Sequence, residues 1–425
     1  MAGIPLRILH LVHQFTPDYL GGTELYTETL ARYQVDMGHS VSILSPSHNE
    51  NDGAPNAVDE VVGRVYRVPV GERSRIRVFK DAFVHQGLTH ALTRILHAER
   101  PQVVHIQHLM GMPAHSINQV RDAGIAYVVT LHDYWYGCAN AQLITNHDAT
   151  NCNGPSRWYI NCGRCALARA GKPGLQWLAP TVAPLMAARN KMLRSILQHA
   201  ARVIAPTEFV RQTYVEMGSP TDNMIVVPHG IELPDDPGSE FLHRQRPTDA
   251  NHIHIGYIGS LAWQKGVHVL IAAVNQLPHE SVHLSICGDV NTNLEYVNRL
   301  RESVQHPGIR FVGRISRSDL WQTLSSFDVL VLPTLWYEAS PLTIQEAFAV
   351  RVPLVASRIG AMQEKIRDGI DGILFSPGDV DALRETLHLL LTEPERLSQL
   401  RSGICPVRTM ADHAREINSI YQELA

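Results

Sequence analysis

Apolar runs alternate with amphipathic stretches through the first half of the chain. The runs are short and rich in β-branched residues: LRILHLV (6–12), SVSILSP (40–46), QVVHIQ (102–107), AYVVTLH (126–132) and ARVIAP (201–206). Between the first two lies TELYTETLARYQVDMG (23–38), which has the pattern of a helix. Strands that alternate with helices in this way predict a parallel sheet wrapped by helices.

A second alternating series follows residue 250. Its apolar runs are HIHIGYIG (252–259), VHLSICGD (282–289), IRFVG (309–313), DVLVLP (328–333), PLVAS (353–357) and GILF (372–375). The polar, proline-bearing segment 233–250 before it predicts a linker. We therefore expect an α/β fold of two Rossmann-like, doubly wound domains, residues 1–230 and 231–405. They should face each other across a cleft, with ligands at the carboxyl ends of the strands.

A cysteine-rich stretch at about 135–180 interrupts the first series and reads as an insertion. Its four cysteines are Cys138, Cys152, Cys162 and Cys165, of which the last two form a CGRC pair. Four thiolates suffice for a tetrahedral structural zinc, but the second CxxC pair of a zinc ribbon is missing. Structural zinc, disulfides and free thiols all stay open at this point.

Composition narrows the class of partner. The chain has 425 residues, of which 44% are hydrophobic and 18% charged, and a formal net charge of −4. These values are typical of a soluble globular protein and give no reason to expect nucleic acid. No run approaches the roughly 18 apolar residues of a membrane span, and the first run reads as a strand and not as a leader. The expected compartment is the cytoplasm, where cysteines stay mostly reduced.

The segment LPTLWYEASPLTIQEAF (332–348) places two carboxylates, Glu338 and Glu346, in otherwise apolar or small-residue surroundings. Ser340 is a favourable N-cap and Pro341 a favourable first helical residue, so a helix is expected to start near 341. Its first free amides, at Leu342 and Thr343, could bind an anion such as a diphosphate. A nucleotide-sugar offers hydroxyls on both sides of that diphosphate. The plainer alternative is a solvated loop residue and an ordinary helix surface residue.

The two glutamates, with seven residues between them, resemble the paired-glutamate motif of the retaining group-1 glycosyltransferases, which have the GT-B fold. The following residues 353–379 are similar to the rest of that family's donor domain. The resemblance implies that Glu338 contacts the donor sugar and Glu346 the ribose. It also implies that the backbone at 341–343 holds the diphosphate, and that a C-terminal helix, residues 406–425, packs back on the first domain.

Further site residues follow from the same resemblance. In IGYIGSLAWQKGVHVLI (255–271), Gly259 and Ser260 form a turn and Lys265 supplies a positive charge to the diphosphate. Many family members carry arginine where this chain has Ser260; Arg314 and Arg358 are candidates to compensate. In the first domain, the resemblance places Gly22 in a glycine loop beside the donor phosphate. It also places His132 facing the donor sugar, and His105 and His108 are weaker candidates for the acceptor side.

The expected function is retaining transfer of a sugar from a nucleotide-diphosphate sugar to a glycan, lipid-linked or small-molecule acceptor, as in polysaccharide biosynthesis. Similar enzymes need no divalent metal, so structural zinc is the one metal considered. Basic stretches at 71–83 and 186–200 admit a peripheral contact with the inner face of a membrane. The alternatives are a nucleotide-sugar epimerase or hydrolase, or a non-catalytic binding protein. A nicotinamide-dependent oxidoreductase is disfavoured because GxGxxG is missing.

Overall fold

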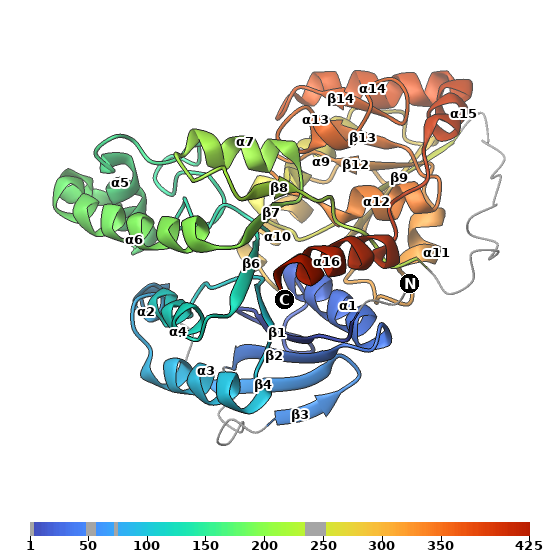
Figure 1. Cartoon of the computed structure of the whole chain (residues 1–425). Helices are drawn as coiled ribbons and strands as arrows, with labels where there is room; N and C mark the ends of the chain where they lie inside the picture. Colours follow the sequence, from blue (N-terminus) through green and yellow to red (C-terminus); the bar gives the residue numbers. More distant parts are fainter. Residues whose placement is uncertain (1–3, 48–56, 72–74, 234–251) are drawn as a thin grey trace. The chain divides into compact units, whose positions relative to one another are not determined.

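The computed structural model describes residues 4–47, 57–71, 75–233 and 252–425 (Figure 1). The chain separates into two compact units: unit 1 comprises Met1–Gly230 with Met410–Ala425, and unit 2 comprises Ile231–Thr409. The predicted linker lies outside the described residues, except for residue 233. Each unit contains one sheet with helices packed against it, which confirms the two Rossmann-like α/β domains expected from the sequence.

Unit 1 has an eight-stranded sheet in the order β3-β4-β2-β1-β5-β6-β7-β8. The strands are β1 (Arg7–Leu11), β2 (Ser40–Ser47), β3 (Ala57–Glu60), β4 (Gly63–Pro69), β5 (Val103–Ile106), β6 (Ala126–Thr130), β7 (Arg202–Ala205) and β8 (Met224–Val226). All neighbouring pairs are parallel except β3 with β4. The central strands are mostly apolar because helices cover both of their faces, and their polar residues His10 and His105 are buried as well.

The helices of unit 1 come from both ends of the chain. They are α1 (Gly22–Asp36), α2 (Arg75–Asp81), α3 (Gln86–Glu99), α4 (Ile117–Asp122), α5 (Ile160–Arg169), α6 (Ala179–His199), α7 (Glu208–Glu216) and α16 (Met410–Leu424), with 3₁₀ turns at Ala114–Ser116 and Pro173–Leu178. The buried face of α16 packs with Tyr26 and Leu30 of α1 and with Ile8 of β1 in one hydrophobic cluster. The last helix is therefore part of the first unit's core.

Unit 2 has a six-stranded parallel sheet in the order β11-β10-β9-β12-β13-β14. The strands are β9 (Ile253–Ile258), β10 (Val282–Cys287), β11 (Ile309–Gly313), β12 (Val329–Leu332), β13 (Leu354–Ser357) and β14 (Gly372–Phe375). The helices are α9 (Val267–Val274), α10 (Leu294–Glu302), α11 (Leu320–Ser325), α12 (Leu342–Ala349), α13 (Met362–Lys365), α14 (Val380–Thr392) and α15 (Pro394–Gly403), with a 3₁₀ turn at Trp263–Lys265.

Strand β12 shows why a central strand of the second sheet is a continuous apolar run. Val329 and Val331 belong to one hydrophobic cluster, whereas Leu330 and Leu332 belong to the cluster on the other face. Successive side chains of a strand point to opposite faces, so both faces of β12 are buried. Among the residues that the structure describes, no helix is long and apolar enough to span a bilayer.

Candidate functional site

The direction of chain winding in unit 2 reverses between β9 and β12. These strands are parallel neighbours, yet the chain moves from β9 toward β11 on one side and from β12 toward β14 on the other. The segments that follow β9 and β12 therefore leave the sheet side by side, and the Leu335 amide donates to the Gln264 carbonyl across 2.8 Å. In open α/β sheets, ligands bind at such a reversal point, outside the carboxyl ends of the strands.

Lys265 and Glu338 meet at this position, one from each segment. The ammonium of Lys265 donates to Oε1 of Glu338 at 2.6 Å. The same oxygen accepts hydrogen bonds from the indole of Trp336 at 2.8 Å and from the hydroxyl of Thr334 at 3.3 Å. Lys265 also lies over the Trp336 ring, 5.5 Å from its centre. The sequence placed both residues in one site, but it did not reveal that they pair directly.

Gly266 allows the two segments to approach this closely. Its φ is +71°, and a Cβ atom at this position would lie 1.8 Å from the carbonyl oxygen of Pro333. Residues with a side chain rarely adopt this backbone conformation, and none would fit against that carbonyl. The glycine thus holds the turn that carries Lys265 against the end of β12.

Helix α12 begins beside Glu338 and has no side-chain cap. The expectation that Ser340 is the N-cap and Pro341 the first helical residue is wrong by one position. Pro341 is the N-cap, with φ −66° and ψ 116°, and the helix runs from Leu342. Proline fixes φ at a value shared by helical and extended backbone, so it does not decide between them.

The start of α12 therefore offers donors to an anion. The first amides of a helix have no intrahelical acceptors, and the helix dipole favours negative charge there. These amides belong to Leu342 and Thr343, whereas Pro341 has no N–H to donate. The hydroxyl oxygen of Ser340 is buried and finds no hydrogen-bond partner among the described residues. A phosphate at this helix end would find both amides and a hydroxyl.

Glu346 lies within α12 and is buried, with 6% of its surface exposed. Its Oε1 accepts a hydrogen bond from Nη1 of Arg317 at 2.5 Å. Arg317 follows β11, is about half exposed, and packs 5.9 Å from the centre of the Trp321 ring. Sequence analysis missed Arg317, because 29 residues separate it from Glu346 and no motif links them.

The turn at the end of β9 is open to solvent. Ser260 is exposed, and its carbonyl accepts the hydroxyl of Tyr257 at 2.8 Å; the Gly259 amide donates to the Cys287 carbonyl at 3.0 Å. Of the two arginines considered as compensation for Ser260, Arg358 is engaged elsewhere. It pairs with Asp368 and donates to the Leu374 carbonyl at 3.1 Å. Arg314 is exposed.

In unit 1, His132 lies two residues beyond the end of β6 and is half-buried. Its Nε2–H donates to Oε1 of Gln107 at 2.9 Å, and the amide nitrogen of Gln107 donates to Nδ1 of His10 at 3.1 Å. The Tyr26 ring packs edge-on against the imidazole at 4.8 Å. Burial, followed by the charge of His108, lowers the pKa of His132 to about 3. The imidazole is therefore neutral at physiological pH, with its Nδ1 as the acceptor.

The two further histidines near these strand ends, His105 and His108, are buried in unit 1. His105 is fully buried: Nε2 donates to the Thr130 hydroxyl at 2.7 Å, and Nδ1 accepts from Tyr421 of α16. His108 is also buried; its Nε2 bonds Asp133 at 3.1 Å, and its Nδ1 accepts the Met110 amide at 3.0 Å. Both ring nitrogens of each residue are engaged within unit 1, and their role on the acceptor side stays a prediction.

Gly22 is the first residue of α1, next to the N-cap Gly21. A Cβ atom on Gly22 would meet nothing within 4 Å, whereas one on Gly21 would lie 2.4 Å from Oε2 of Glu24. A side chain at 21 would therefore displace the Glu24 carboxylate, whereas there is open space at 22. That space, at the carboxyl end of β1, leaves room for a ligand to approach the backbone.

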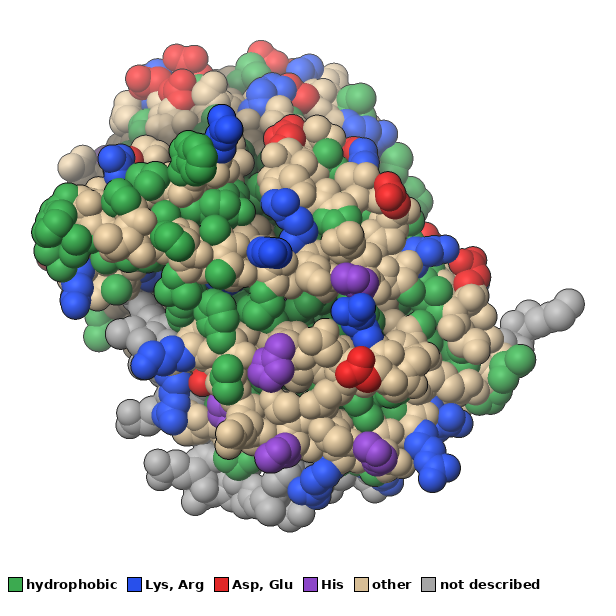
Figure 2. All heavy atoms as spheres, turned by 60° about the vertical axis from the view of Figure 1, so that its left-hand side comes forward, with side chains coloured by type: hydrophobic (Ala, Val, Ile, Leu, Met, Phe, Trp, Pro, Cys, Tyr) green, Lys and Arg blue, Asp and Glu red, His purple; other side chains and the backbone are tan. Residues whose placement is uncertain are grey.

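An apolar cavity of about 450 Å³ lies in unit 1, beyond the carboxyl ends of β5 and β6. Helices α2, α5 and α6 supply most of its lining, and Met110 and Trp135 lie on its sheet side. Exposed hydrophobic side chains occur nearby, including Trp177 and Leu185. Figure 2 shows hydrophobic side chains gathered on this face of the molecule, with Lys and Arg side chains among them.

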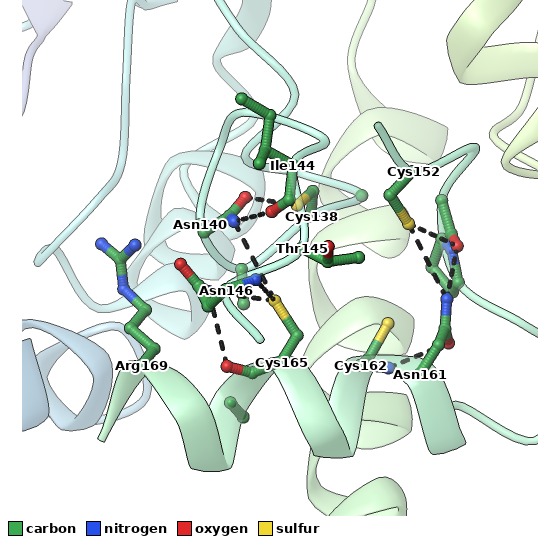
Figure 3. Close-up of a pocket in the computed structure, with 15 residues that line it drawn as sticks. Cys138, Asn140, Ile144, Thr145, Asn146, Cys152, Asn161, Cys162, Cys165 and Arg169 are labelled. Carbon is green, nitrogen blue, oxygen red and sulfur yellow. Dashed lines mark hydrogen bonds between the residues drawn. The ribbon is translucent and has the colours of Figure 1, made fainter. Parts of the chain in front are cut away.

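The four insertion cysteines come together around a second, smaller cavity of about 40 Å³ (Figure 3). All four are free thiols and are partly buried. As their side chains lie, no group of three or more His, Cys, Asp or Glu residues in the described ranges is arranged to hold a metal ion. The four cysteines for which zinc, disulfides and free thiols stayed open thus lie around one cavity, but their side chains do not form a complete metal site.

The fold defines a two-domain α/β protein with a candidate anion site at the reversal point of its second sheet. Comparisons with known proteins specify the class. The family model described as Glycosyltransferase Family 4 matches residues 20–234, and that described as Glycosyl transferases group 1 matches residues 238–403. The chain belongs to the group-1 glycosyltransferases, and it is an enzyme of the glycosyltransferase type with a GT-B fold.

Individual relatives agree with this assignment. The chain is 26% identical over 405 residues to a glycogen synthase of Mycobacterium tuberculosis (strain CDC 1551 / Oshkosh), which covers 92% of this chain and 87% of that protein. The sucrose-phosphate synthase of Thermosynechococcus elongatus superposes with a TM-score of 0.72 at 18% identity, covering 98% of each chain. HepE of Anabaena, solved in complex with UDP and glucose, has a TM-score of 0.64 at 18% identity, covering 99% of this chain and 98% of that one.

Proposed function

We propose that this glycosyltransferase uses a nucleotide-diphosphate sugar as donor, binds it at the reversal point of unit 2, and transfers the sugar with retention of configuration. The observation that carries the proposal is the convergence of Lys265, Glu338 and the uncapped start of α12. Two structural neighbours were solved with UDP and glucose and with ADP and acarbose, which supports a nucleoside diphosphate as part of the donor.

In this proposal, the diphosphate lies against the amides of Leu342 and Thr343, and the ammonium of Lys265 turns toward it. Glu338 is then released from its partner and accepts hydroxyls of the sugar. Glu346, which is buried within the same helix, binds the ribose hydroxyls on the other side of the diphosphate. Gly259 and Ser260 border the diphosphate from the end of β9.

The reaction breaks the bond between the anomeric carbon and the diphosphate oxygen and joins that carbon to an acceptor hydroxyl oxygen. The leaving diphosphate gains negative charge, which Lys265 and the amides of α12 stabilise in place. The acceptor proton leaves with the diphosphate. We propose that these protein groups supply the positive charge without a divalent cation. Within unit 1, His132 is neutral and held by Gln107; the donor contacts expected from the sequence for His132 and Gly22 stay predictions.

The acceptor is proposed to bind unit 1. The apolar cavity of about 450 Å³ there fits the non-sugar part of a lipid-linked acceptor better than a free glycan, because few polar groups line it. Basic residues on the neighbouring helix α6 and the exposed Trp177 would favour a peripheral contact with an anionic membrane face. Vesicle sedimentation tests this contact, and the absence of any salt-sensitive binding would exclude it.

The donor is tested by thermal unfolding of the full chain with UDP-, GDP- and ADP-sugars. A ligand at 100 times its Kd should stabilise the binding unit by about 2.7 kcal/mol. Nucleotide release is then measured with glycan and lipid-linked acceptors, and the anomeric configuration of the product is read by NMR. If no nucleotide-sugar raises the melting temperature, the proposal fails. Release without any acceptor would identify a hydrolase, and an inverted product would refute retention.

A further inference from the structure

The segment between β6 and α5 is held in an unusual backbone conformation with little secondary structure. It contains one isolated bridge, Ile144 with Asn151, and no strand among its described residues. Of the six described non-glycine residues with positive φ, four lie here: Ala141, Leu143, Ala149 and Tyr159. Each such residue costs roughly 1 kcal/mol or more, so the surrounding structure must over-determine the conformation. A long connection without regular structure also needs anchoring.

Four thiols converge inside this segment. Cys138 and Cys152 come from the loop, and Cys162 and Cys165 come from α5, three residues apart and so on one helix face. All four line the same cavity of about 40 Å³, which is roomy enough for an ion but not for a larger ligand. Figure 3 shows the sulfur atoms of Cys162 and Cys165 directed from the helix toward the loop that carries the other two.

N–H groups already point at two of the sulfur atoms, those of Cys165 and Cys152, whereas the thiols of Cys138 and Cys152 donate to Oδ1 of Asn140 at 2.8 Å and to the Gly154 carbonyl at 3.3 Å. The side-chain amide of Asn146 donates to Sγ of Cys165 at 2.9 Å, and its backbone N–H donates to the same sulfur at 3.4 Å. The side-chain amide of Asn161 lies 3.8 Å from Sγ of Cys152. Donors of this kind stabilise the negative charge of a metal-bound thiolate and orient it. Neutral thiols would gain less from them.

A buried cation lies next to the cluster. Arg189 is 1% exposed and donates to the Trp135 carbonyl at 2.7 Å and to the Asn190 side chain at 2.9 Å. Asn190 in turn donates to the Gly137 carbonyl, directly before Cys138. Within the described residues Arg189 forms no ion pair with a carboxylate, although buried charges are usually compensated. An anionic centre at the thiols would supply the missing charge.

We propose that Cys138, Cys152, Cys162 and Cys165 together bind one Zn²⁺ as thiolates. Binding releases the four thiol protons and leaves a centre with a net charge of −2, which Arg189 partly offsets. The site is closed by rotation of the cysteine side chains toward the cavity, since their present rotamers do not complete a ligand shell. Zinc in structural sites is nearly always bound by four such ligands and undergoes no redox change there.

The consequence concerns the neighbouring apolar cavity. Ala139, Ala166 and Arg169 line both the thiol cavity and the cavity of about 450 Å³. Zinc would therefore fix one wall of the larger cavity by joining the loop to α5. This inference stands on unit 1 alone and does not depend on the donor site of unit 2.

The test is metal analysis of the full chain, purified without chelator, by plasma mass spectrometry. About one zinc per chain is expected, with release by a mercurial that titrates thiolates. Cys165→Ser and Cys152→Ser should lose most of the zinc, whereas the matched control Cys405→Ser, which removes an exposed cysteine outside the cluster, should keep it. If the Ser variants do not fold, the zinc content of the unchanged chain still decides.

Three results would overturn the proposal. The first is less than about a tenth of a zinc per chain with all thiols open to alkylation in denaturant. The second is protection of the four cysteines from alkylation that is lifted by reductant and not by chelator, which shows disulfides. The third is iron with acid-labile sulfide in place of zinc, since tetrahedral thiolate sites also suit iron–sulfur clusters. Chelation that lowers the melting temperature, with recovery on adding zinc, supports it.

Discussion

The pair formed by Lys265 and Glu338 yields the sharpest prediction, because its two members should respond to substitution in opposite directions. Lys265→Met keeps most of the stem and removes the charge, whereas Glu338→Gln keeps the shape and the acceptor oxygen. The side chains are 26% and 10% exposed, and the ion pair spans 2.6 Å. In the ligand-free protein, the ammonium of Lys265 and the carboxylate of Glu338 neutralise each other's charge.

The magnitude follows from that environment. Removing one partner of a fully buried pair costs about 3–5 kcal/mol, and an exposed pair contributes about 0–1. Lys265 is partly exposed, and Glu338 keeps its bonds from Trp336 and Thr334. We therefore expect Lys265→Met to lower the free energy of unfolding of unit 2 by about 1–2 kcal/mol, between these limits.

Nucleotide binding separates the two roles. Lys265→Met removes a charge-assisted hydrogen bond of about 1.5–3 kcal/mol to the diphosphate, so the Kd for the nucleoside diphosphate should rise about 10- to 100-fold. Glu338→Gln frees the lysine, so the same Kd should stay unchanged or fall, while turnover drops. Isothermal titration with the diphosphate that protects the protein, together with nucleotide-release rates, measures both quantities.

Arg299→Ala is the matched control, since it removes an exposed cation of the same unit on α10 and should change neither quantity. The double variant completes a thermodynamic cycle for unfolding. Should Glu338→Gln weaken diphosphate binding as much as Lys265→Met, the carboxylate would not be the sugar-binding member of the pair. A coupling energy near zero would show that the ion pair contributes nothing in solution.

Three further predictions concern other parts of the molecule. Gly266→Ala should lower the free energy of unfolding by roughly 2–4 kcal/mol, and the melting temperature with it, because the added Cβ would lie 1.8 Å from a carbonyl oxygen. Gly22→Ala is the control, since a Cβ there meets open space. Equal melting temperatures of the two variants would refute the argument. Glu346→Gln should raise the nucleotide Kd about tenfold by weakening a ribose contact, and an unchanged titration contradicts that role. Burial lowers the pKa of His10 to about 4, so its stabilisation is complete above pH 6.5 and is lost as pH falls toward 4. Denaturant unfolding of His10→Gln should show a pH slope smaller by up to about 1.4 kcal/mol per pH unit in that window, and an unaltered slope would exclude the assignment.

The strands of both sheets were predictable where burial on both faces left a continuous apolar run. Strands β3 and β4, at one margin of the first sheet, and β8, at the other, were not among the predicted ones. Strand β4 carries charges such as Arg64 and Arg67, which pair with Glu99 and Glu60, so it shows no apolar run. An edge strand needs fewer apolar side chains because part of it stays in contact with solvent. In the first sheet the hydrophobic pattern therefore detects the central strands better than those at the margins, whereas in the second sheet it also detects the edge strands β11 and β14.

The sequence named Lys265, Glu338 and Glu346 as site candidates, but it revealed neither their pairings nor Arg317. Lys265 and Glu338 are 73 residues apart, and Arg317 and Glu346 are 29 apart, so only the strand order brings each pair together. Spacing along the chain specifies one helix or one turn. It carries no information on which cation a parallel sheet will set beside which carboxylate.

These pairings change how the two glutamates are understood. A buried carboxylate needs a counter-charge, and each glutamate of the motif has one in the absence of ligand: Lys265 for Glu338 and Arg317 for Glu346. A diphosphate at the start of α12 would compete with Glu338 for Lys265, and the carboxylate would then need new donors. Sugar hydroxyls are such donors. On the proposed function, binding of the diphosphate and recognition of the sugar are therefore coupled through one lysine, which explains why two carboxylates can flank an anion site without repelling its ligand.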